Sequence, residues 1–267
     1  MKAKEFINEI ERLYPTDFTG GKGFLDIEKS YKPIAKKAVN VKNLRPLPGN
    51  NSLMYTTDGN KQQMRIIVLD KDNREPVAML KLDKSSLPFK NAYAVDIITV
   101  DKAHQGQGIA KGLYAAALKD LNITLVAGVS QTPGGRANWV KLAQNPDVEV
   151  KGYLTIDDFW FGPANQKEYD KQIQRKKDMG YSDATIQKDM AIKNNEITKR
   201  QDAIMNLGAE YLGSFTNKGG HQKIFAIPVT VGPKEVANAI KNSKVKIYTP
   251  QGDYDDNWTT GLFAQAV

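Results

Sequence analysis

The sequence contains no cysteine and only two histidines, His104 and His221, among its 267 residues. Without cysteine the chain can form no disulfide, offers no thiolate nucleophile and cannot build a cysteine-based zinc site. Two isolated histidines are too few for an imidazole-based metal centre. We therefore expect a protein without a bound metal.

Long apolar runs are also absent, since no uncharged stretch approaches the ~18 residues that a membrane-spanning helix needs. Residues 1–15 are charged throughout and lack the apolar centre of a secretory signal. These absences predict a cytoplasmic protein that does not enter the membrane. The net charge of +8 permits binding of an acidic partner, but it does not indicate whether that partner is an anionic small molecule, nucleic acid or an acidic protein.

The most informative stretch is residues 94–119, where a strand runs through a glycine-containing turn into a helix predicted over 108–118. The apolar strand positions are Val95, Ile97, Ile98 and Val100. Gly106 and Gly108 fall at the helix start, where backbone N–H groups lack intrahelical partners and the helix dipole is positive. Glycine also lets a phosphate approach the backbone without meeting a Cβ atom. The pattern thus indicates an anion site made by main-chain atoms.

Two nucleotide-binding motifs fail at this turn. A P-loop needs Gly-Lys-Ser/Thr at its end, and the turn has no such ending. A dinucleotide fingerprint could use Gly106, Gly108 and Gly112, but residues 101–105 separate the strand from these glycines. The next predicted strand, 123–129, also ends without the acidic residue that would bind a ribose. An ordinary glycine-rich corner remains the structural alternative.

The segment Gln105–Ala110 resembles the Gln/Arg-x-x-Gly-x-Gly/Ala element of the GNAT N-acetyltransferases, which lies between their fourth strand and the following helix. The resemblance implies an acetyl-CoA-dependent N-acyltransferase whose turn amides bind the pyrophosphate of the acyl donor. The turn residues that the resemblance implies for binding this cofactor are Gln105, Gly106, Gln107, Gly108, Ile109, Ala110 and Lys111. It further implies that main-chain atoms of Ile98 and Val100 contact the pantetheine arm, in a slot where two strands splay apart.

The order of predicted elements agrees with this resemblance over roughly residues 50–155. Strands are predicted at 53–57, 64–69, 77–82, 93–100, 121–129 and 148–156, with a helix around Trp139. The fold class is therefore α+β, with a GNAT-like, mixed, mostly antiparallel sheet flanked by helices.

Further segments are predicted before and after this core. They comprise a helix at 4–13, helices at 166–179 and 184–207, a hairpin at 209–230, a helix at 236–240 and a strand at 245–248. Ser182 or Asp183 is expected to cap the second long helix and Gly208 to end it. We divide the chain into an N-terminal helix and basic segment (1–48), the acetyl-CoA-binding core (49–162), a helical insertion (163–208), and a closing hairpin with a C-terminal extension (209–267).

Acetyl transfer to an amine needs a group that removes the amine proton. Asp96 interrupts the apolar fourth strand nine residues before Gln105, where many GNAT relatives have a glutamate, so the resemblance implies that Asp96 is the base. An aspartate satisfied by local amides is the alternative. Relatives often use a tyrosine as general acid where this chain has Trp139, and Tyr93 and Tyr114 are the candidate replacements.

A basic segment precedes the core and contains no acidic residue between positions 29 and 57. Its cations are Lys29, Lys32, Lys36, Lys37, Lys42 and Arg45. Such a segment can bind nucleic acid or an acidic protein, although a solvated surface is the commoner role. The acceptor class stays open between a small amine, a protein amine and an aminated nucleobase.

Two non-enzymatic hypotheses stand beside the acyltransferase. One is a weakly active or inactive GNAT-like scaffold in a larger assembly, an idea supported by the missing tyrosine, the helical insertion and a resemblance to acetyltransferase-like proteins of bacteriophages. The other is a nucleic-acid-binding module, which should show steep salt dependence.

Overall fold

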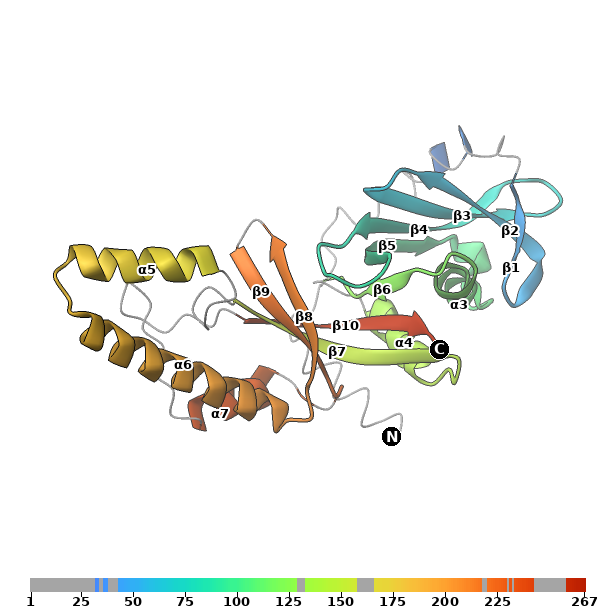
Figure 1. The fold of residues 1–267 in the computed structure, drawn as a ribbon. Helices are drawn as coiled ribbons and strands as arrows, with labels where there is room; N and C mark the ends of the chain where they lie inside the picture. Colours follow the sequence, from blue (N-terminus) through green and yellow to red (C-terminus); the bar gives the residue numbers. More distant parts are fainter. Residues whose placement is uncertain are drawn as a thin grey trace. The chain divides into compact units, whose positions relative to one another are not determined.

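The computed structural model describes residues 32–33, 36–37, 43–128, 133–157, 166–217, 220–229, 231, 233–242 and 258–267 (Figure 1). These residues fall into two compact units. One contains the chain up to Val150 together with Gly261–Val267, and the other contains Lys151–Thr260. The helix expected at 4–13 and the strand expected at 245–248 lie outside the described residues. Within the described part of the chain, no helix has the length and apolar character needed to cross a membrane.

The first unit is built on an antiparallel meander. Its strands are β1 Arg45–Leu47, β2 Asn50–Gly59, β3 Gln63–Asp70, β4 Pro76–Lys84 and β5 Ala92–Val100. Each strand pairs antiparallel with the next. The four strands predicted here are confirmed, whereas β1 was not predicted. Burial is nearly complete at the centre of β3 and β4, for example at Ile67 and Leu80, and this apolar centre holds the sheet in register.

A helix packs against this sheet directly after the glycine turn. It comprises α3, Ile109–Ala115, and a π-helical turn, Ala116–Asp120. The Tyr55 hydroxyl donates to Asp120 Oδ2 at 2.8 Å and ties the end of the helix to β2. At Gly112 a Cβ atom would lie 2.8 Å from the Pro48 carbonyl oxygen. Gly112 therefore serves close helix–sheet packing.

Two further strands complete the sheet of the first unit. β6, Thr124–Val126, pairs in parallel with the start of β5 and antiparallel with β10, Trp258–Ala266. The strand predicted over 121–129 thus has only three residues, with Val129 outside the described part, and β10 was not predicted. α4, Pro133–Ala143, follows β6 and buries Trp139 against Tyr114. The predicted mixed, mostly antiparallel sheet flanked by helices is confirmed.

The second unit combines a three-stranded antiparallel sheet with three helices. The strands are β7 Val148–Asp157, β8 Glu210–Asn217 and β9 Gly220–Ile227, paired in the order β7, β9, β8. The helices are α5 Gln166–Asp178, α6 Asp183–Met205 and α7 Pro233–Asn242. α5 and α6 confirm the helices predicted at 166–179 and 184–207, and the Ser182 hydroxyl accepts the Thr185 N–H at 3.2 Å as the expected cap.

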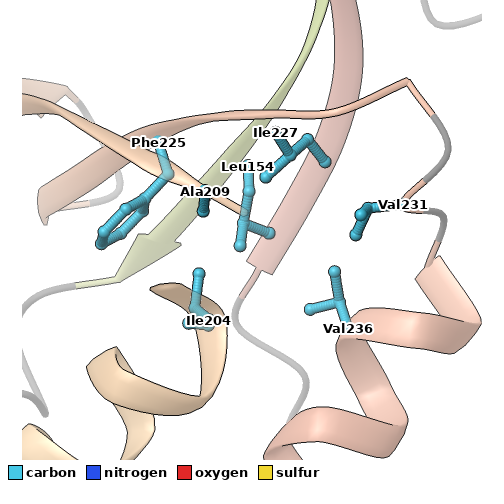
Figure 2. Close-up of a cluster of buried hydrophobic side chains, with 7 residues drawn as sticks. All are labelled: Leu154, Ile204, Ala209, Phe225, Ile227, Val231 and Val236. Carbon is cyan, nitrogen blue, oxygen red and sulfur yellow. The ribbon is translucent and has the colours of Figure 1, made fainter. Parts of the chain in front are cut away.

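Buried apolar side chains hold the second unit together (Figure 2). Ile204 from α6 and Val236 from α7 point toward the strand residues Leu154 and Ile227. The whole cluster consists of Leu154, Ile204, Ala209, Phe225, Ile227, Val231 and Val236. Ile204 of α6 therefore faces a core of this unit's own.

Candidate active site

The glycine turn between β5 and α3 has the geometry of an anion cradle. Gly106 and Gly108 have φ angles of 79° and 76°, in the left-handed region that favours glycine, and Gly108 caps the helix. Apart from the chain neighbours, no atom of the described residues lies within 4 Å of a Cβ built at either glycine, so open space adjoins the backbone. Residues with left-handed φ at a turn present successive N–H groups to an anion. The turn therefore fits a phosphate group bound by main chain.

Several backbone N–H groups at the start of α3 have no acceptor within the helix and can bind a ligand. Its first hydrogen bond runs from the Gly112 N–H to the Gly108 oxygen at 3.0 Å. The N–H groups of Ile109, Ala110 and Lys111 precede that bond and have no acceptor within the helix. These amides belong to the residues that the family resemblance implies for pyrophosphate binding, and the helix dipole adds positive potential there.

Two strands separate next to this turn. β5 pairs with β4 along residues 93–100, but with β6 only at residues 92–94. From Val95 onward, the β5 edge that faces away from β4 has no strand partner among the described residues. The expected separation of the two strands is present, and binding of the pantetheine arm there stays a prediction.

Hydrogen-bond directions along β5 show which peptide groups face the slot. The Asp101 N–H donates to the Val77 oxygen at 2.9 Å, which makes these two residues a hydrogen-bonded pair of the antiparallel ladder. Because such pairs alternate, the peptide groups of Val100 and Ile98 point away from β4, toward the unpaired side. Gln105 Nε2 donates to the Val100 oxygen at 3.1 Å and so links the strand end to the turn.

Asp96 lies in a β-bulge at the start of the unpaired part of β5. Lys81 pairs with Ile97 and the adjacent Leu82 pairs with Val95, so Asp96 is the extra residue on β5. Its exposed carboxylate contacts the Lys81 ammonium. Bulges redirect side chains and are frequent beside active sites. The sequence did not reveal this bulge or its lysine partner, because both depend on the register between two strands.

The two candidate tyrosines are both buried. Tyr93 is buried in the section of β5 that pairs with β6, and its hydroxyl donates to the Lys61 oxygen at 3.3 Å. Tyr114 is 1% exposed, and burial raises the pKa of its hydroxyl. A buried phenol with a raised pKa is a poor proton donor to a leaving group. We therefore leave both tyrosines out of the proposed site.

Described members of the basic segment contact residues of the first unit. Lys32 forms an ion pair with Asp101 at 2.9 Å, and Lys36 pairs with Glu75 at 3.4 Å. Lys29 and Lys42 lie outside the described residues. Binding of nucleic acid or an acidic protein by this segment stays a prediction. No group of three or more potential metal ligands occurs within the described ranges.

Comparison with known proteins agrees with this geometry. Residues 28–124 match the family model for the acetyltransferase (GNAT) family. No curated protein matches the chain significantly. Similar solved structures include a protein assigned to the GNAT family from Desulfovibrio desulfuricans, at 10% identity and a TM-score of 0.25, covering 84% of this chain and 92% of that one. A second, at 10% identity and a TM-score of 0.21, is an aminoglycoside 6'-N-acetyltransferase complexed with coenzyme A, with 86% and 92% coverage.

A third similar structure is a GNAT-family acetyltransferase from Bordetella pertussis, at 10% identity and a TM-score of 0.23, with 84% and 88% coverage. Because all three TM-scores lie well below 0.5, the assignment rests on the family match and on the local geometry. The strand, the left-handed glycines and the helix that follows them all lie inside the matched segment. The matched segment, residues 28–124, is therefore similar to a GNAT acetyltransferase domain.

Proposed function

We propose that this chain is an acetyl-CoA-dependent N-acetyltransferase that acts on an amine. The observation that supports it best is the unpaired edge of β5, toward which the peptide groups of Ile98 and Val100 point and which the glycine turn follows in the chain. An extended pantetheine arm could pair with the β5 edge while the turn amides bind the pyrophosphate. Acetyl-CoA supplies the activated acetyl thioester.

In this proposal each group of the protein has a separate task. The amides of Ile109, Ala110 and Lys111 bind phosphate oxygens. Asp96, on the bulge, accepts the proton of the acceptor amine, directly or through one water molecule. We assign no general acid, because an alkyl thiol has a pKa of about 8.5 and its thiolate leaves far more readily than an alkoxide.

Two measurements on the purified protein test the proposal. Calorimetric titration should show binding of acetyl-CoA and of CoA in the micromolar range. CoA release can be followed with a thiol reagent against a panel of small amines, polyamines, lysine peptides and aminated nucleosides, with no protein background because the chain lacks cysteine. Binding together with amine-dependent release supports the proposal. Absence of binding contradicts it and favours the scaffold alternative.

The variant Tyr114→Phe tests whether the buried Tyr114 acts as a general acid. We expect it to release CoA within about twofold of the wild-type rate, because its hydroxyl is buried at 1% exposure and its raised pKa makes it a poor acid. The measurement is CoA release with the best acceptor of the panel, across pH. A loss of about 100-fold in kcat with unchanged stability would instead make Tyr114 the general acid.

A further inference from the structure

We infer that Lys81 is a positioning residue for the candidate base Asp96, so that it acts on the reaction through that carboxylate. The inference rests on the proposed function. Lys81 is on β4, directly opposite the bulge, and its ammonium contacts Asp96 Oδ2. Both side chains are partly shielded, at 26% exposure for Lys81 and 33% for Asp96.

The backbone beneath Lys81 is fixed by its neighbours. Leu80 and Leu82 flank it on β4, and both are fully buried. A strand anchored on both sides of one residue holds that residue's Cα in place, so the ammonium moves only by side-chain rotation. Asp96, by contrast, is the extra residue of a bulge, where the ladder does not fix the backbone as tightly. The backbone of Lys81 is therefore held more firmly than that of Asp96.

The positive charge of Arg65, on the opposite side of Lys81 from Asp96, favours the orientation of the Lys81 side chain toward Asp96. Arg65 on β3 lies directly opposite Lys81, and like charges in that position repel. Arg65 itself donates to Asp58 at 3.0 Å and to the Gln63 side chain at 2.9 Å. The carboxylate of Asp58 on β2 is thus bound by Arg65, and that of Asp83 on β4 accepts a hydrogen bond from Gln63 Nε2 at 2.9 Å.

The contact with Lys81 can hold the Asp96 carboxylate in place for proton transfer. A general base must lie within hydrogen-bond reach of the proton that it accepts, and a carboxylate on an exposed bulge can rotate away into solvent. The charge-assisted contact with Lys81 restricts that rotation while leaving the second carboxylate oxygen to an acceptor amine or water. Removal of the ammonium should therefore lower the rate of transfer and leave acetyl-CoA binding unchanged.

A double-mutant cycle tests this role, measured as CoA release with the best acceptor of the amine panel. We expect Asp96→Asn to lower kcat by about 100-fold, within the range of general-base contributions. Lys81→Met should lower kcat by about tenfold with the KM for acetyl-CoA within about twofold, and Lys81→Arg should restore most of the rate. In the Asp96→Asn background Lys81→Met should have no further effect, because residues that act as one unit are non-additive.

The matched control is Lys176→Met, which removes a lysine of similar exposure, 21%, whose carboxylate partner is Asp189 on α6. We expect it to keep the wild-type rate. A rate for Lys81→Met equal to wild type, or the same tenfold loss in the Asp96→Asn background, overturns the positioning role while the acetyltransferase stands. Wild-type protein that neither binds acetyl-CoA nor releases CoA overturns the proposed function, and the positioning role with it.

Carbodiimide cross-linking tests the contact between Lys81 and Asp96 without an activity assay. Carbodiimide treatment joins amines and carboxylates that touch, so peptide mass spectrometry should find a Lys81–Asp96 cross-link. The exposed pair Lys119 and Asp147, at 2.5 Å, is the internal reference for the same reagent. Cross-linking of that reference pair without any Lys81–Asp96 product overturns the inference.

Discussion

Replacement of Gly108 by valine is expected to weaken acetyl-CoA binding by at least about 100-fold, a change of about 2.7 kcal/mol. Two effects add in this variant. Gly108 has a φ of 76°, which a β-branched residue adopts only with strain, so the turn must change shape. The new side chain would also occupy the open space beside the backbone, where the phosphate is proposed to bind. Calorimetric titration with acetyl-CoA measures the loss.

A matched variant separates the site from backbone strain in general. Gly180 has a φ of 84° and open space at its Cβ position, but it lies in the turn between α5 and α6. Gly180→Val should therefore bind acetyl-CoA as tightly as the wild type. S-acetylpantetheine, which lacks the pyrophosphate, should be turned over equally by wild type and Gly108→Val. Unchanged acetyl-CoA affinity in Gly108→Val would contradict the assignment of this turn.

The sequence predicted the strand, the glycine turn and the helix of the candidate site because the signals there are local. The apolar alternation of β5, the two glycines and the start of α3 follow one another in the chain and depend on backbone preferences alone. The same is true of the helical insertion, where Ser182 is a cap that can be recognised from sequence. These elements could be placed without knowledge of any long-range contact.

The parts that could not be predicted depend on pairing between distant segments. β10 combines the strand-favouring residues Trp258, Thr259, Thr260 and Phe263 with Gly261, which weakens a strand, and its place in the sheet comes from pairing with β6. β1 is a three-residue strand in a basic, proline-containing segment and pairs with β2. The bulge at Asp96 follows from the register of β4 against β5, which also decides that Lys81 is its partner.

Truncation of Trp139 to alanine should lower the free energy of unfolding by about 3–5 kcal/mol, the range for large aromatic side chains removed from a core. Trp139 is 2% exposed and its ring lies 6.4 Å from that of Tyr114, so the variant leaves a cavity between α4 and α3. Urea unfolding followed by far-ultraviolet circular dichroism measures the change. The indole of Trp139 cannot act as a general acid, because its N–H donates hydrogen bonds but does not release its proton in the range where enzymes work.

The variant Trp139→Phe decides whether the indole has any part in the reaction. Phenylalanine keeps an aromatic ring against Tyr114, so this variant should lose less than about 2 kcal/mol of stability and keep the wild-type rate of CoA release. A stable Trp139→Phe protein with a strongly reduced kcat would contradict the structural role and place the indole at the reacting groups. If rate and stability instead fall together only in Trp139→Ala, Trp139 supports the site by holding α4 against α3. The general acid of many relatives would then be replaced here by a packing residue.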